Sequence, residues 1–236
     1  MRPKRIWELD AFRGLCILFM VLIHFVYDLH DLYRLVSFPY PAIFLLLKDW
    51  GGILFLLLSG ICVTLGSRSC KRGLIVFACG LLCTAVTVGM VLLGYEKDLI
   101  IYFGVLHCLG VCMLLWPLFR RLPVWALALL GLLLTAGGYV LRSFTVPTDL
   151  FLALGLHSRS FASSDYFPLL PNLGWFLLGA VIGKTAYREK KTLFPRVNDR
   201  ALPLRALCWC GRHSLAIYLL HQPVLAGICM LWQSFR

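Results

Sequence analysis

The sequence has too few polar residues to cover a soluble fold. Hydrophobic residues make up 60% of its 236 residues, whereas a soluble domain is about 45–50% apolar. It also lacks the alternating pattern of a transmembrane β-barrel, because its apolar runs are continuous. These two absences exclude a soluble domain and a barrel. They predict an all-α, polytopic transmembrane helical bundle.

Acidic residues are scarce, with 11 aspartates and glutamates against 23 lysines and arginines, and the net charge is +12. In a soluble protein this balance would suggest a nucleic-acid partner. Here no soluble region offers a basic groove or an aromatic platform, so we expect no nucleic acid. The excess positive charge instead predicts a cytoplasmic face that attracts the anionic lipid bilayer.

The ten cysteines contain no pair of CxxC units, so we expect no metal site of the zinc type. Most of them lie inside apolar runs, where cysteine packs as a small hydrophobe. The opening MRPKR mimics a secretory signal, but no small-residue cleavage site follows the apolar run. We therefore expect an uncleaved signal anchor.

Seven apolar segments are long enough to cross a bilayer. Most of the basic residues fall before the first segment and in every second connection after it, which predicts a cytoplasmic N-terminus and an external C-terminus. The basic connection 188–212 is expected to carry an amphipathic surface helix around Leu202–Cys210. The predicted spans of this multi-pass inner (plasma) membrane protein are Leu9–Asp28, Ala42–Gly66, Gly73–Gly94, Leu99–Phe119, Val124–Leu141, Pro171–Tyr187 and Ser214–Trp232.

The first span carries four ionisable residues, Asp10, Arg13, His24 and Asp28, on one narrow stripe. At about 100° per residue, Arg13 and His24 point within about 20° of each other, and the two aspartates lie about 40–60° further round. Ionisable groups inside a spanning helix are expensive and by default mark function. Arg13 is a candidate clamp for a phosphate, or alternatively a snorkelling arginine paired with Asp10.

His24 is the candidate general base, and Asp28, one turn further, could orient or charge its imidazole. Further candidates are His30 beyond the first span, His107 in the fourth span, His221 in the last span and Arg212 at the cytoplasmic boundary. For each histidine, a hydrogen bond that serves only helix packing is the alternative. A metal site built from His24, Asp28 and His30 is weakly specified.

Four motifs together resemble a known family. They are R-x4-D-x2-R-G with a histidine eleven residues later in the first span, YFGVLHCLG, DYFPLLPNLGWFLLG and GRHSLAIYLLHQPVL. The first is similar to the opening helix of the membrane-bound acyltransferase-3 type, where the arginine and histidine are essential. All four resemble the bacterial relatives of heparan-alpha-glucosaminide N-acetyltransferase over nearly the whole chain.

The resemblance implies one transmembrane acyltransferase-like domain over residues 1–236. It would move an acyl group, usually acetyl, from cytoplasmic acetyl-coenzyme A to an amino sugar or other glycan acceptor outside. Arg13 and His24 occupy the matching positions, with Asp10, Arg212, His221 and His107 as further candidates on the coenzyme side. In the lysosomal enzyme an asparagine stands at the position of His24 and a histidine in the next outer loop acts, for which His30 is the nearest candidate.

Two other function classes remain open at this point. A transporter or flippase could use the same histidines as a proton relay. A haem protein could use His24, His107 and His221 as axial ligands. The sequence leaves the acceptor, the acyl chain length and the oligomeric state open, a homodimer included.

Overall fold

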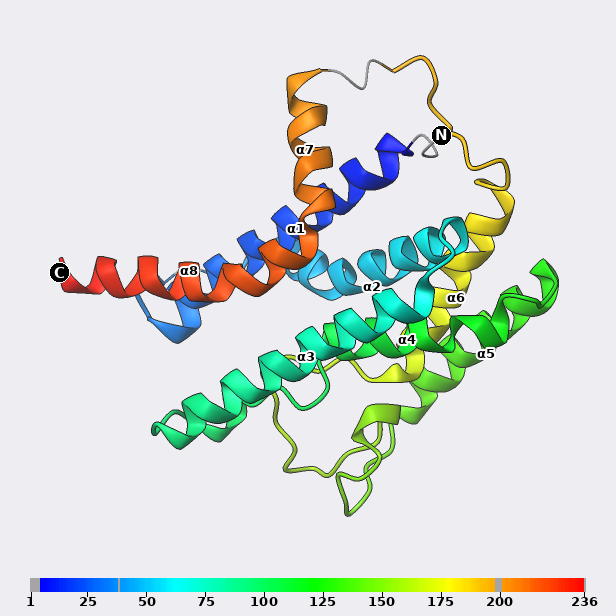
Figure 1. The fold of residues 1–236 in the computed structure, drawn as a ribbon. Coiled ribbons are helices and arrows are strands. Elements are labelled where there is room, and N and C mark those ends of the chain that lie inside the picture. Colours follow the sequence, from blue (N-terminus) through cyan, green and yellow to red (C-terminus); the bar gives the residue numbers. More distant parts are fainter. Residues whose placement is uncertain (1–4, 38, 198–200, 236) are drawn as a thin grey trace. The chain divides into compact units, whose positions relative to one another are not determined.

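The computed structural model describes residues 5–37, 39–197 and 201–235, and most of these residues are helical (Figure 1). Within these residues the only β contact is an isolated bridge between Phe103 and Tyr166. The predicted all-α class is therefore confirmed. The helices are α1 (Trp7–Tyr27), the π-helical η1 (Asp28–Leu32), α2 (Ala42–Leu65), α3 (Ser69–Leu92), η2 (Lys97–Leu99), α4 (Val105–Phe119), α5 (Val124–Leu141), η3 (Leu152–Leu154), α6 (Leu169–Thr185), α7 (Leu202–Arg212) and α8 (Ser214–Ser234).

The helix lengths agree with about seven membrane spans. Five helices are long and apolar enough to cross a bilayer, namely α1 continued by η1, α2, α3, α5 and α8. The apolar helices α4 and α6 are shorter, with 15 and 17 residues. The predicted amphipathic helix in the basic connection is present as α7. Which side of the membrane each connection faces stays a prediction.

The fourth span begins later than predicted, at Val105 instead of Leu99. The connection between α5 and α6 holds the preceding segment in an extended form. The hydroxyl groups of Ser163 and Ser164 donate to the carbonyls of Ile100 and Leu99, at 2.9 and 2.8 Å. A carboxylate oxygen of Asp165 accepts the backbone N–H of Val105 at 3.1 Å, at the start of the helix. These partners lie more than fifty residues away in the sequence, so the apolar pattern of the segment itself could not predict where the helix begins.

The described chain forms two compact units. One comprises the residues up to Phe55 together with those from Lys191 onward, and the other is Leu56–Lys190. The expected single domain over 1–236 stays a prediction. In the first unit α7 crosses α1, and α8 lies along α1 and contacts η1 (Figure 1). In the second unit α3 packs on α4, α5 packs on α6, and α4 also contacts α6.

Glycines allow the close helix crossings in both units. A Cβ on Gly14 of α1 would collide with the Leu207 carbonyl of α7, and one on Gly211 of α7 would collide with the Asp10 carbonyl of α1. In the second unit a Cβ on Gly179 of α6 would collide with the backbone of Leu57 in α2. Small residues at such contacts are typical of helix packing in membranes. The α1–α7 crossing is important for the site, because it brings the end of α7 to Asp10.

Candidate functional site

The first unit contains a buried polar group where α1 passes into η1. Asp28, the first residue of η1, has a fully buried side chain. Its Oδ1 accepts a hydrogen bond of 3.3 Å from Nε2 of Gln222 in α8. Its Oδ2 is also buried and has no hydrogen-bond partner among the described residues. A buried carboxylate oxygen without a partner is costly, so this atom is poised to accept a donor from a ligand.

Two histidines complete this group. The rings of His24 in α1 and His221 in α8 meet edge to face, with 4.8 Å between their centroids. Nδ1 of His24 donates to the carbonyl of Met20 at 2.9 Å, and Nδ1 of His221 donates to the carbonyl of Tyr218 at 2.5 Å. A carbonyl can only accept, so Nδ1 carries the proton in both rings. In the neutral rings Nε2 is therefore the proton acceptor.

Nε2 of His221 is buried and has no partner among the described residues. His24 is close enough to both Asp28 and His221 to interact with them electrostatically. The sequence predicts that Asp28 orients His24. In the structure the carbonyl of Met20 orients the ring instead, and Asp28 pairs with Gln222. The group thus offers two unprotonated imidazole nitrogens and one free carboxylate oxygen to a ligand.

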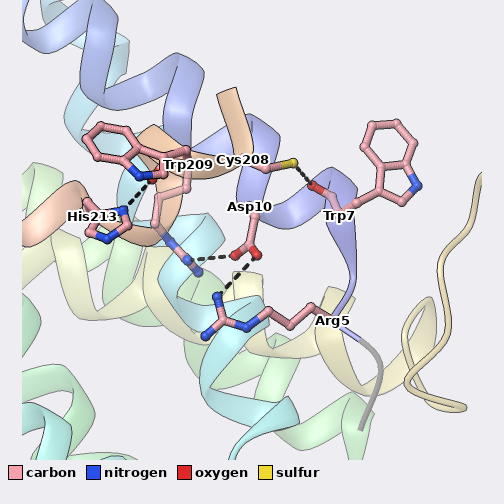
Figure 2. A network of polar contacts seen from close by, with 7 residues as sticks. Arg5, Trp7, Asp10, Cys208, Trp209 and His213 are labelled. Atoms are coloured by element: carbon pink, nitrogen blue, oxygen red, sulfur yellow. Dashed lines mark hydrogen bonds and ion pairs between the residues drawn. The ribbon is translucent and has the colours of Figure 1, made fainter. Parts of the chain in front are cut away.

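Arg13 and Asp10 lie nearer the start of α1 and form an ion pair. Nη1 of Arg13 is 3.3 Å from Oδ1 of Asp10, and Nη1 of Arg5 is 3.7 Å from Oδ2 of the same carboxylate. The Arg13 side chain is 22% exposed and the Arg5 side chain is 69% exposed. Asp10 therefore holds two guanidinium groups, and Figure 2 shows its contact with Arg5. Asp10 contacts both arginines, and the coenzyme-binding role predicted for it stays a prediction.

The second half of α7 is fixed to the first turns of α1. The thiol of Cys208 donates to the Trp7 carbonyl at 3.4 Å, as Figure 2 shows beside Asp10. His213, which ends α7, donates from Nδ1 to the Trp209 carbonyl at 2.9 Å. Arg212 follows Gly211, which abuts the Asp10 backbone, and its side chain is exposed. The fold thus brings Arg212 to the turn of α1 that carries Asp10 and Arg13.

His30 belongs to a separate group further along η1. Its Nδ1 lies 2.8 Å from a carboxylate oxygen of Asp31, and the other oxygen of Asp31 accepts the Tyr40 hydroxyl at 2.5 Å. Desolvation and the hydrogen bond to Asp31 raise the pKa of Tyr40 to about 12, so this phenol stays a donor at neutral pH. A cavity of about 390 Å³ is lined by His30, Asp31, Arg34, Val36 and Ser37.

His107 lies in the second unit and has no free nitrogen. Its Nδ1 accepts the Gly104 N–H at 3.2 Å, and its Nε2 lies 3.4 Å from the Thr84 hydroxyl. That hydroxyl donates to the carbonyl of Ile101 at 2.6 Å, so it accepts the proton on Nε2. The coenzyme role predicted for His107 stays a prediction, and the observed contacts explain its burial as packing.

Sequence reasoning missed Gln222 as a member of the group around Asp28. The signal was available, because Gln222 follows His221 inside an apolar helix, where a primary amide needs a partner. Its partner is 194 residues away, which no local pattern reveals. Among the described residues, no three His, Cys, Asp or Glu side chains converge so that they could hold a metal ion.

Comparison with known proteins identifies one family. Residues 5–223 match the family described as heparan-alpha-glucosaminide N-acetyltransferase, catalytic. No curated protein matches the chain, and no solved structure matches it. The matched range contains both histidine groups of the first unit, the Arg13–Asp10 pair, and His107.

Proposed function

Because the chain belongs to the heparan-alpha-glucosaminide N-acetyltransferase catalytic family, we propose that it is a membrane-embedded acetyltransferase of the cell inner membrane. Acetyl-coenzyme A on the cytoplasmic side is the donor. The amine or hydroxyl of an amino sugar or other glycan on the outer side is the acceptor. The helices long enough to span a bilayer support the membrane location, and the matched family supports the reaction class.

One observation carries this proposal, namely the buried group of His24, His221 and Asp28 with its unpartnered acceptor atoms. Acetyl transfer requires an acceptor that gives up a proton when its nitrogen or oxygen bonds to the acyl carbon. A neutral imidazole with Nδ1 held by a carbonyl offers Nε2 for that proton. We assign this role to His24, with His221 beside it.

The step balances with the groups at hand. The acceptor lone pair attacks the thioester carbonyl carbon, the carbon–sulfur bond breaks, and the coenzyme leaves as a thiolate. Nε2 of His24 takes the proton of the acceptor and returns it to the thiolate. The free oxygen of Asp28 accepts a hydrogen bond from the acceptor and stabilises the imidazolium while it exists.

Arg13 and Arg212 bind the phosphates of the coenzyme in this proposal. A guanidinium offers a planar fork of donors that matches phosphate oxygens, and Asp10 holds that of Arg13 in place. His30 is the alternative base, because its contact with Asp31 is the arrangement that orients an imidazole. The test must therefore separate His24 from His30.

The test is transfer of labelled acetyl from acetyl-coenzyme A to a panel of amino sugars and hydroxyl acceptors, using protein in lipid nanodiscs. We expect His24→Gln to bind acetyl-coenzyme A normally and to lose at least about 10²-fold in kcat, the usual scale for a general base. We expect His30→Gln to retain activity.

His213→Gln is the matched control, because Nδ1 of His213 makes the same 2.9 Å contact to the carbonyl four residues earlier. Full activity in His24→Gln with loss in His30→Gln would move the base to the His30 group. Absence of acetyl transfer to every acceptor by the unchanged protein would overturn the proposed function.

A further inference from the structure

A cavity of about 340 Å³ lies in the second unit, where four helices end together. Its walls are the end of α2 with the following turn, the first residue of α3, the last turn of α4 and the end of α6. This volume is at the lower end of the range for small-molecule sites. The acetyl-transfer proposal assigns no role to the residues that line this cavity.

Ser69 is a polar residue in the lining of this cavity. Ser69 begins α3 and is only 7% exposed, yet its side chain has no hydrogen-bond partner among the described residues. Nor does any side chain cap the start of α3. A hydroxyl at the cavity and uncapped first-turn amides of α3 can both donate hydrogen bonds to a negatively charged occupant.

Lys184 adds a positive charge to the lining of the cavity. Its ammonium donates to the carbonyls of Arg120 and Leu122, at 2.8 Å each, and lies 5.9 Å from the centre of the Trp116 ring. An ammonium has three N–H donors, so one remains after these two bonds. The two carbonyls follow the end of α4 and account for two of the three donors of Lys184.

Two arginines add to this charge. Arg120 is one of the residues that line the cavity. The guanidinium of Arg72 lies against Gly66 in the wall, since a Cβ on Gly66 would be 2.5 Å from its Nη2. The described lining residues include no carboxylate. The basic residues here also belong to the connections that the sequence places on the cytoplasmic face.

We propose that this cavity binds a phosphate group, with the hydroxyl of Ser69 and the cations of Lys184, Arg120 and Arg72 as its donors. Charged donors around a small opening suit the several acceptor oxygens of a phosphate. The group can be supplied by a soluble phosphate compound such as the coenzyme or by an anionic phospholipid headgroup. The site stands whether or not the chain transfers acetyl groups.

Binding alone tests the proposal, so its failure is separate from failure of the proposed function. Calorimetry measures inorganic phosphate and coenzyme A binding to the protein in phosphatidylcholine nanodiscs. Native mass spectrometry measures retention of phosphatidylglycerol over phosphatidylcholine. The informative variants are Ser69→Ala, which removes a hydroxyl without a protein partner, and Arg120→Gln. Arg121→Gln is the matched control, an exposed neighbour outside the cavity lining.

We expect Ser69→Ala and Arg120→Gln each to weaken one of these interactions by about five- to tenfold, with Arg121→Gln unchanged, as for loss of one charge-assisted hydrogen bond. An effect on phosphate or coenzyme A supports a soluble ligand, and an effect on phosphatidylglycerol supports a lipid headgroup. The proposal is overturned if neither variant changes the binding of inorganic phosphate, coenzyme A or phosphatidylglycerol. Equal weakening by Arg121→Gln also overturns it, because diffuse surface charge would then explain binding.

Discussion

His107 and His221 are both buried in apolar helices, one in each compact unit. They differ in how many of their ring nitrogens have a hydrogen-bond partner. Both nitrogens of His107 are engaged, one by a backbone N–H and the other by a threonine hydroxyl. His221 uses Nδ1 on its own helix and leaves Nε2 without a partner among the described residues. The residue type and its apolar setting are the same, so the neighbours decide which histidine is available for chemistry.

The same replacement at the two positions should change stability by very different amounts. His107→Leu should lower the free energy of unfolding by about 2–4 kcal/mol, because it leaves the buried Gly104 N–H without its acceptor and removes the contact of Nε2 with the Thr84 hydroxyl. His221→Leu should leave it unchanged or raise it, because the lost Nε2 had no partner. Denaturant unfolding in detergent checks this contrast, and equal losses would contradict it.

Asp28→Asn should make the protein more stable and less active. The amide keeps the shape and removes a buried charge whose Oδ2 has no partner, so we expect a gain of about 1 kcal/mol. Acetyl transfer should fall about tenfold, because an amide stabilises the imidazolium of His24 less well than a carboxylate does. Thermal unfolding and turnover are measured together.

Asp98→Asn serves as the control for the Asp28 test, since Asp98 is an exposed carboxylate in η2. It should change neither quantity. A drop in both stability and activity in Asp28→Asn would show that the carboxylate is a packing element, as His107 is.

The two arginines on Asp10 allow a similar contrast between a half-buried and an exposed group. Arg13→Lys should weaken binding of acetyl-coenzyme A about five- to tenfold, because the charge remains and the bidentate fork is lost. Arg5→Lys should have little effect, since the Arg5 side chain is 69% exposed. Calorimetry measures the affinity of both variants for acetyl-coenzyme A. Equal weakening in the two variants would show that the loss follows from the altered ion pairs of Asp10 and not from a specific contact of Arg13.

Thr84→Val gives the smallest expected effect. It removes the hydroxyl that accepts from His107 and donates to Ile101, so stability should fall by about 1 kcal/mol. Acetyl transfer per folded molecule should not change. Loss of activity at unchanged stability would instead give His107 a role in the chemistry.

Most of the helices could be predicted from local pattern. The long apolar runs correspond to α1, α2, α3, α5 and α8, and the basic connection contains the expected helix α7. The start of α4 could not be predicted, since Asp165 and two serines from a distant loop hold residues 99–104 in contacts that precede the helix. Hydropathy measures transfer to lipid and carries no information on such partners.

The candidate site was predicted in part. The stripe on α1 correctly placed His24 and Asp28 close together, because helical periodicity determines which residues share a face. Of the two roles predicted for Asp28, the structure does not show orientation of His24, since the carbonyl of Met20 holds its ring and Gln222 of α8 donates to Asp28. The catalytic and coenzyme-binding roles stay predictions.

The sequence by itself determined that this is an all-helical membrane protein with ionisable residues inside its spans, because hydropathy and helical period are local properties. Only the tertiary structure decided which of those residues keep an unpaired atom. Hydrogen-bond satisfaction depends on neighbours brought in by packing, as the α1–α8 contact brings His221 to His24 and Gln222 to Asp28. In an apolar interior, water cannot replace a missing hydrogen-bond partner. Whether both ring nitrogens are paired therefore distinguishes a histidine that serves packing from one that is available for chemistry.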